Sequence, residues 1–593
     1  MIIIILRLII FFILSLGLGY FILYRNYKIF TSSKAIHSLF IGILLNTVLF
    51  IVTKIINIHW FFMFTPSTLL IVLYFFYHDR YLPRKYLINY KHLFYYSLGF
   101  LFFSLLLIIQ GFKMGVGTYP GCFYNIDTPY YLQFVHSFIQ NDTYPPISLL
   151  NINDAHKYHY GVMALGALVS KFSGVTAHMA FCFIVPVLGN FFLFSYIKIN
   201  LPNSKNFYLF LLFLLFLLFT VDEMGQQGWN YINRYTRSSG FPLISSLYGL
   251  AIGLAVLSYS RKYWFNAGLL MLFFIPIFKI PFAPILLLGF CSVVFIDIFV
   301  NRSYKNIKYI IIGPIVMMFS YFIFSQYKGH VETSDVFAYF NFPNLYGTLY
   351  YWYTFVIYFM LVIVFLIIRK ISVVKIFSEE WRDMINILLF TMPLPILMLF
   401  VKLTNPNAYQ FSTIFPVFMG VFTATFAIKL YMLSKRRIRI IILFFAISVM
   451  IPALLNYGIN ITRILKDSSR GYQYCNNDAM AEILITLPIE GTVIITNDLR
   501  YPAENNKPDG RQFQISAIYG HQSFLTNLHY ENSKKRRKKL IELVQSDKWD
   551  FEIERMASQY GITHLLVHKN YIYPNDIPLD VLIENRQYIL FKF

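Results

Sequence analysis

Long apolar stretches follow one another along most of the sequence, separated by short polar segments. Leu209–Thr220 and Ile440–Leu455 contain no charged residue and are too long for ordinary core strands. Apolar stretches of about 17–25 residues predict membrane-spanning helices. The predicted spans lie near 3–24, 35–57, 60–77, 93–112, 178–197, 207–221, 241–260, 263–280, 282–300, 307–326, 347–368, 384–402, 408–432 and 440–459. We therefore predict a polytopic α-helical membrane protein with about 13–14 transmembrane helices.

The composition agrees with this class. Hydrophobic residues make up 57% and charged residues 13% of the 593 residues, whereas a soluble protein carries about a quarter charged residues. Residues 1–24 are apolar over more positions than the central region of a signal peptide, and no small-residue cleavage site follows them. We interpret them as a first membrane helix.

Most Lys and Arg residues of the membrane part fall in alternate loops, and the formal net charge is +22. The basic loops lie near 25–34, 80–91, 198–205, 261–262, 302–308, 369–382 and 435–439. Such loops face the cytoplasm in membrane proteins. The alternation requires that 158–171 does not cross the membrane, so we predict a helix there that lies at the interface or dips into it.

The opposite, non-cytoplasmic face receives most of the remaining polar residues. It is predicted to hold a large loop at 113–177, further loops at 222–240, 327–346 and 404–407, and everything after about 460. Most acidic residues of the membrane part lie in these loops. This one-sided distribution is not needed by a protein that only anchors or scaffolds.

The last 130 or so residues have lower hydropathy and a different pattern. Strands are predicted at Gly491–Asn497, Thr563–Val567 and Gln587–Phe593, and helices at Ser533–Ser546 and Asp550–Tyr560. This alternation predicts a small α/β domain. The predicted domains are extra N-terminal helices over 1–92, a catalytic bundle over 93–460, and an extracytoplasmic α/β domain over 461–593.

The basic run Lys534–Lys539 is the one feature that suggests nucleic acid. It has no interleaved aromatic residues and belongs to the predicted non-cytoplasmic domain. We interpret it as a solvated helix face or a contact with anionic headgroups, and predict no nucleic-acid partner.

Asp127 lies in the large loop within the sequence FYNIDTPYY. A carboxylate held in an aromatic setting near the membrane surface can act as a general base. Asp before Thr-Pro also fits the N-cap of a helix over Thr128–Ile139, and the two roles are compatible. Tyr130 offers an aromatic surface on which a sugar can stack.

A second group of candidates occupies the next outer segments. Asp222 and Glu223 end a predicted helix, and Arg234 and Arg237 follow; arginine suits bidentate binding of phosphate. Lys279 lies at the outer turn between two apolar helices. It is either a lysine that snorkels to water or a functional cation.

Weaker signals complete the set. Lys402, Asn405, Asn407 and Gln410 form a polar patch, with Gln410 a candidate substrate ligand. His159 is a further candidate substrate ligand. It lies near Asp154 and His156, a spacing that permits a metal site, but too few ligands can be assigned to prefer a metal site over satisfied interfacial histidines. We predict no metal site. The four cysteines have no metal or redox spacing, and no nucleotide-binding motif is present.

The layout resembles the GT-C superfamily of membrane glycosyltransferases, which use polyprenyl-phosphate-linked sugars. Asp127 in FYNIDTPYY matches the family's first acid, and Asp222–Glu223 in TVDEMG matches the second. The tail, with ISAIYGHQSFLTN and GITHLLV, is similar to the end domains of bacterial members. The resemblance covers roughly 93–593. Two departures are the extra N-terminal helices and a single Asp where several members have a D-x-D-like pair; a divalent cation therefore stays an alternative to no cofactor.

The resemblance implies an enzyme of a bacterial inner membrane that takes a sugar from a polyprenyl-phosphate donor to a glycan, lipid or protein acceptor. Asp127 would deprotonate the acceptor, with inversion, and Arg234, Arg237 and Lys279 would face the donor phosphate. The rival interpretations are a flippase for lipid-linked glycans and an envelope polysaccharide polymerase or ligase. A flippase predicts polar residues deep within the helices, and a polymerase or ligase gives more weight to the arginines of 222–240.

Overall fold

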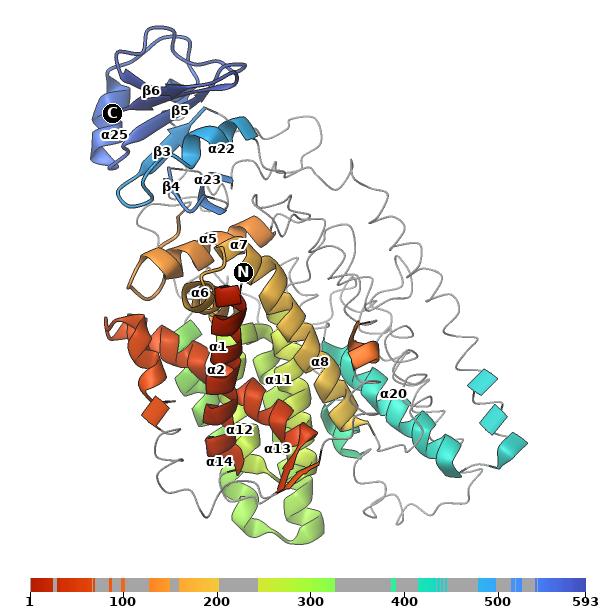
Figure 1. Ribbon diagram of the computed structural model, residues 1–593. Coiled ribbons are helices and arrows are strands. Elements are labelled where there is room, and N and C mark those ends of the chain that lie inside the picture. The colour runs from red at the N-terminus through yellow and green to blue at the C-terminus, as the bar shows by residue number, and fades with distance from the viewer. Residues whose placement is uncertain are drawn as a thin grey trace, which may run out of the picture.

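The protein is a helical bundle followed by a small sheet domain (Figure 1). The computed structural model describes residues 2–24, 29–66, 68–69, 85–87, 97–101, 127–149, 159–201, 244–325, 385–390, 414–433, 435–437, 439–440, 443–444, 478–497, 514–517, 519–524, 539–540 and 542–593. Within them, five helical segments are long and apolar enough to cross a membrane: Ile2–Leu23, Ser33–Ile55, Ala177–Asn200, Phe265–Phe299 and Tyr304–Ser325. The predicted class, a helical membrane bundle with a C-terminal α/β domain, is confirmed.

Helices α1 (Ile2–Tyr24) and α2 (Ser32–Ile55) cross each other through small residues. A Cβ atom added to Gly42 of α2 would overlap the Ser15 carbonyl oxygen of α1. Asn46 donates a hydrogen bond to the Ser15 hydroxyl at 2.9 Å. Close backbone approach through Gly and Ser is how membrane helices associate without a hydrophobic driving force.

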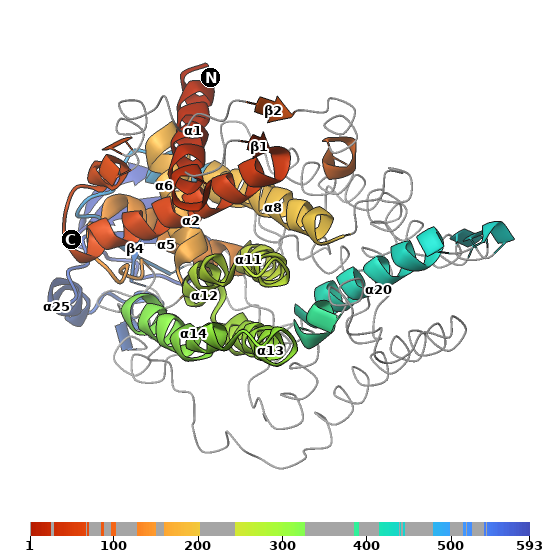
Figure 2. The same cartoon turned by 90° about the horizontal axis from the view of Figure 1, so that it is seen from below.

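The other long helices described extend the bundle to one side of this pair (Figure 2). It contains α8 (Val185–Asn200), α11 (Ile244–Arg261), α12 (Phe265–Lys279), α13 (Ala283–Asn301), α14 (Ile307–Ser320) and α20 (Ile414–Leu433). The buried apolar residues of these helices form one continuous core with those of α1 and α2. The predicted spans at 207–221 and 347–368 lie outside the described residues, as do the predicted domain boundaries.

Basic loops gather at the end of the bundle away from the C-terminal domain. Helix α8 runs from α7 (Ala177–Met179) away from that domain (Figure 1). At its far end Arg261 of α11 donates to the Asn200 carbonyl at 2.6 Å. The short basic turns α11–α12 and α13–α14 connect helices at the same end. This grouping agrees with the predicted alternation; the assignment of that end to the cytoplasm stays a prediction.

Two shorter helices, α5 (Asp127–Gln140) and α6 (Gly161–Ser173), lie at the opposite end, near the C-terminal domain (Figure 1). The helix predicted within 158–171 is therefore present. Eleven of its 13 residues are buried, so protein covers it on most sides and it does not lie flat on the lipid surface. A 13-residue helix is about 20 Å long, too short to span a bilayer.

The C-terminal domain contains a five-stranded mixed sheet in the order β4-β3-β5-β7-β6. Strand β3 (Val493–Thr496) is parallel to β4 (Gln522–Ser523) and β5 (His564–His568), while β7 (Tyr588–Lys592) is antiparallel to β5 and β6 (Asp580–Glu584). Helices α22 (Asp478–Leu484), α23 (Gln514–Ala517) and α25 (Glu552–Gln559) accompany it. The three predicted strands and the helix within 550–560 are confirmed; β4, β6, α22 and α23 were not predicted.

Candidate functional site

Helix α5 begins at Asp127, one residue before the predicted start, and ends at Gln140. Asp-Thr-Pro favours a helix start here because Pro at an early helical position gives up no hydrogen bond. The structure describes the backbone of Asp127 and Tyr130 within α5, and their side chains lie outside what it describes. The base and N-cap roles of Asp127 therefore stay predictions.

Lys279 ends α12 and immediately precedes the 3₁₀ turn Ile280–Phe282 that leads into α13. Only 1% of its surface is exposed, so the side chain does not snorkel to water. Its ammonium donates to the Ser245 hydroxyl of α11 at 3.4 Å. A cation at the C-terminal end of a helix is favoured by the helix dipole, which helps this charge to remain buried.

His159 is the second predicted residue that the structure brings to this place. It is buried, 3% exposed, just before α6. Burial, and secondly the positive charge of Lys279, hold the pKa of His159 well below its usual value. The imidazole is therefore neutral at pH 7. Gly161 permits the close approach of α6 to α12, because a Cβ there would lie 2.9 Å from the Ile277 carbonyl oxygen of α12.

Helix α5 packs on the residue that follows His159. Phe134 and Phe138 of α5 pack on Tyr160, with ring centroids 5.0 Å and 5.9 Å apart. Tyr160 is 1% exposed and lies between His159 and Gly161. The helix that begins with Asp127 is thereby seated directly on the segment that carries His159.

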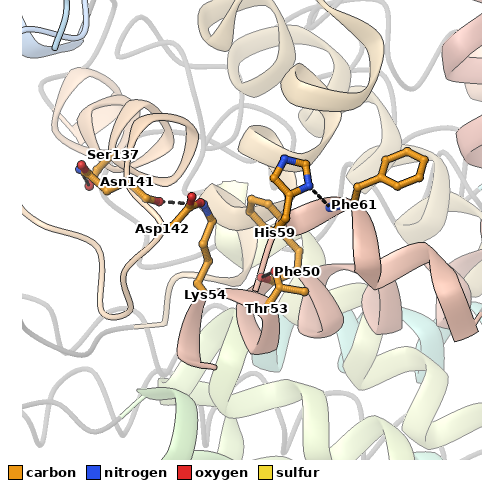
Figure 3. Close-up of polar contacts among 8 residues, drawn as sticks. All are labelled: Phe50, Thr53, Lys54, His59, Phe61, Ser137, Asn141 and Asp142. Carbon is orange, nitrogen blue, oxygen red and sulfur yellow. Dashed lines mark hydrogen bonds and ion pairs between the residues drawn. The ribbon is translucent and has the colours of Figure 1, made fainter. Parts of the chain in front are cut away.

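A second polar cluster fixes the other end of α5 (Figure 3). The fully buried Lys54 ammonium of α2 donates to the Asn141 carbonyl at 2.7 Å and forms an ion pair with Asp142. The hydrogen bond that Lys54 donates to the Asp142 carboxyl holds the pKa of that carboxyl below its usual value. Lys171 of α6 lies nearby, and burial together with the Lys54 charge lowers its pKa to about 8.

Lys54 was not predicted as a site residue. Its sequence signal is a lone cation in the last turn of an apolar helix, and its partner Asp142 is 88 positions away. Asp222, Glu223, Arg234, Arg237 and Gln410 lie outside the described residues, as do Asp154 and His156. Among the residues that the structure describes, no group of three His, Cys, Asp or Glu could hold a metal ion.

No protein-family model matches the sequence, and no curated protein matches it. Among solved structures, the chain is similar to the oligosaccharyltransferase of Archaeoglobus fulgidus in its apo form, at 13% identity and a TM-score of 0.38, covering 81% of this chain and 70% of that one. It is also similar to the archaeal oligosaccharyltransferase AglB from Archaeoglobus fulgidus in complex with an inhibitory peptide and a dolichol-phosphate, at 12% identity and a TM-score of 0.36, covering 81% and 69%. TM-scores of this size mark a loose likeness and do not establish a shared activity.

Proposed function

We propose that the protein is an integral membrane glycosyltransferase that moves a sugar from a polyprenyl-phosphate donor to a glycan, lipid or protein acceptor. The observation that carries the proposal is where α5 packs. The helix that begins at Asp127 packs on Tyr160, the neighbour of a buried neutral imidazole, His159, whose pKa is lowered in part by the charge of the buried Lys279. A carboxylate, a cation and a hydrogen-bonding group near the end of an apolar bundle suit a lipid-linked phosphate sugar.

In the proposed reaction Asp127 accepts the proton of an acceptor hydroxyl as its oxygen attacks the anomeric carbon. The bond from that carbon to the phosphate oxygen breaks, and the polyprenyl phosphate leaves with the bonding electron pair, with inversion at the carbon. The leaving group is an anion, so it needs a cation more than a proton. Lys279 is the described residue suited to this role, since a buried charge acts through a low dielectric. His159 contributes a neutral hydrogen-bonding group.

The other residues keep the roles predicted from the sequence. We propose Asp222 and Glu223 as further acids and Arg234, Arg237, Tyr130 and Gln410 as substrate ligands. The end of the bundle that carries α5 and the C-terminal domain would be the non-cytoplasmic face of a bacterial inner membrane. No resident cofactor is proposed, and a divalent cation is the alternative.

The test is transfer of sugar from a polyprenyl-phosphate donor by the purified protein in lipid nanodiscs. Asp127→Asn should lower kcat by about 10²–10⁴-fold, because it removes the base. Lys279→Met should lower kcat by about 10²–10³-fold, because it removes charge stabilisation. Asp297→Asn is the matched control: this buried carboxylate of α13 accepts a hydrogen bond from Asn306 in the turn at the far end of the bundle.

The outcomes separate the rival functions. Full transfer by Asp127→Asn would remove Asp127 from the mechanism. If transfer were instead lost in Arg234→Ala, a polymerase or ligase would be favoured. Movement of lipid-linked glycan across the bilayer with no transfer would favour a flippase.

A further inference from the structure

The C-terminal domain contacts α5 through the segment 514–524, far from it in the sequence. Gln140 of α5 donates its side-chain amide to the Gly520 carbonyl at 2.7 Å. Gly520 has φ +74°, and a Cβ there would lie 2.7 Å from both Gln140 Nε2 and His136 Nδ1. Position 520 therefore requires glycine for two reasons: its positive φ and its close approach to α5.

A second set of hydrogen bonds runs through Leu149, which follows α5 along the chain. The Gln133 side-chain oxygen of α5 accepts from the Leu149 amide at 2.8 Å. The Leu149 carbonyl in turn accepts from the Ser523 amide of β4 at 2.8 Å and from the Ser516 hydroxyl of α23 at 3.1 Å. One backbone residue thus joins α5 to the sheet of the C-terminal domain.

The docking segment is also tied firmly to its own domain. Ser523 pairs with Ile494 of β3, and the His521 Nε2–H donates a hydrogen bond to the Leu484 carbonyl of α22 at 2.9 Å. Tyr519 packs against both the bundle core and a core of the C-terminal domain. A displacement of the domain would therefore be passed to α5 and not absorbed by a flexible linker.

We infer that the C-terminal domain is a positioning module for α5, docked through Gly520 and Leu149 so that it sets the place of the helix that begins at Asp127. Gln133, Gln140 and Gly520 are then positioning residues: they contact no reacting group and act through α5. The catalytic part of this inference rests on the proposed function; the docking itself does not. A misplacement of about 1 Å at a reacting group can cost on the order of 10²-fold in rate.

The experiment compares Gly520→Leu with Gly561→Leu in the full-length protein in nanodiscs. Gly561 lies in the same domain with φ +66° and has no heavy atom within 4 Å of a built Cβ. Both variants lose stability because a side chain is placed at positive φ, but only Gly520→Leu places that side chain against α5. Gln140→Ala is a third variant that leaves the C-terminal domain unaltered and removes one docking bond.

Hydrogen exchange measures docking without any activity. We expect the amides of Ser523 and Leu149 and the last two turns of α5 to exchange about tenfold faster or more in Gly520→Leu. Amides of β5 should keep their wild-type rates, and Gly561→Leu should leave Ser523, Leu149 and α5 unchanged. Gln140→Ala should show a smaller acceleration at the same amides. Unchanged exchange at these amides in Gly520→Leu would overturn the inference.

Transfer kinetics then test positioning. We expect Gly520→Leu to lower kcat about tenfold or more with an unchanged KM for the lipid donor, while Gly561→Leu retains wild-type kcat. Faster exchange at α5 with an unchanged kcat would overturn the positioning role. If the wild-type protein transferred no sugar, the proposed function would fail, while the exchange at the last two turns of α5 would still decide whether the domain holds that helix.

Discussion

The α1–α2 crossing and the seat of α5 join helices by different kinds of contact. At the crossing, backbone meets backbone at Gly42 and Ser15, and close approach is possible because a side chain is missing. Around α5, polar side chains make the contacts. Lys54 binds the residues that follow the C-terminal end of α5, and Gln140 of α5 binds the C-terminal domain. The first contact cannot loosen without separating the helices. The second consists of bonds that can break and re-form singly, so we expect α5 to be the adjustable part of the structure.

The largest effect should come from filling the crossing. Gly42→Ala would drive a methyl group into the Ser15 carbonyl, a backbone atom that no rotamer change can move. We expect a loss of about 2 kcal/mol or more of unfolding free energy, measured as thermal unfolding in detergent. In the control Gly313→Ala the nearest atom is a Leu287 side-chain methyl at 3.2 Å. That variant should stay within about 0.5 kcal/mol of wild type, and equal losses in both would show that the crossing is not specially tight.

A smaller loss of unfolding free energy should come from breaking the Lys54–Asp142 pair, and the loss should differ between the two partners. The Lys54 side chain is fully buried, whereas 54% of the Asp142 side chain is exposed. Asp142→Ala leaves a buried charge that keeps its hydrogen bond to the Asn141 carbonyl but loses its counter-ion. Lys54→Met instead leaves a carboxylate that water can reach. We expect about 1–2 kcal/mol for Asp142→Ala, after allowance for solvent screening, and less for Lys54→Met.

The pH dependence of that variant checks the cause. The folded-state pKa of Asp142 is depressed by Lys54, so its stabilisation is present above the unfolded pKa of about 3.9 and is lost as pH falls through the folded value. The difference in melting temperature between wild type and Asp142→Ala should therefore shrink at low pH. A larger cost for Lys54→Met at pH 7 would mean that packing and not charge governs this contact.

Local signals in the sequence explain which parts of the structure could be predicted. The break at Lys279 follows from an Ile-Pro turn between two apolar runs, and the start of α5 from Asp-Thr-Pro. Strands β3 and β5 follow from short apolar runs whose residues are mostly buried. Strand β6 was missed because its apolar run, Val581–Ile583, is only three residues long and does not alternate with polar residues.

The contacts that seat α5 could not be predicted in the same way. Gln140 and Gly520 are 380 positions apart, and their bond joins a side chain to a backbone carbonyl. Such a bond depends on how two elements pack and leaves no period or spacing in the sequence. His159 and Lys279 were selected separately as candidates, and only the close approach of α6 to α12 at Gly161 shows that they share a site.

The smallest effect should come from His159, which lies beneath α5. Its folded-state pKa is well below the usual value, chiefly through burial and then through Lys279, so below pH about 6.5 the unfolded chain binds a proton that the folded chain does not. The stability due to the neutral imidazole is therefore full above that pH and is lost as pH falls toward the folded value. Between pH 7.5 and 5.5, wild type should lose about 1 kcal/mol more than His159→Gln, measured as the change in melting temperature of each. Equal losses of stability in wild type and His159→Gln would mean that water reaches His159 readily. The region under α5 would then be one of the adjustable contacts and not part of the dry interior of the bundle.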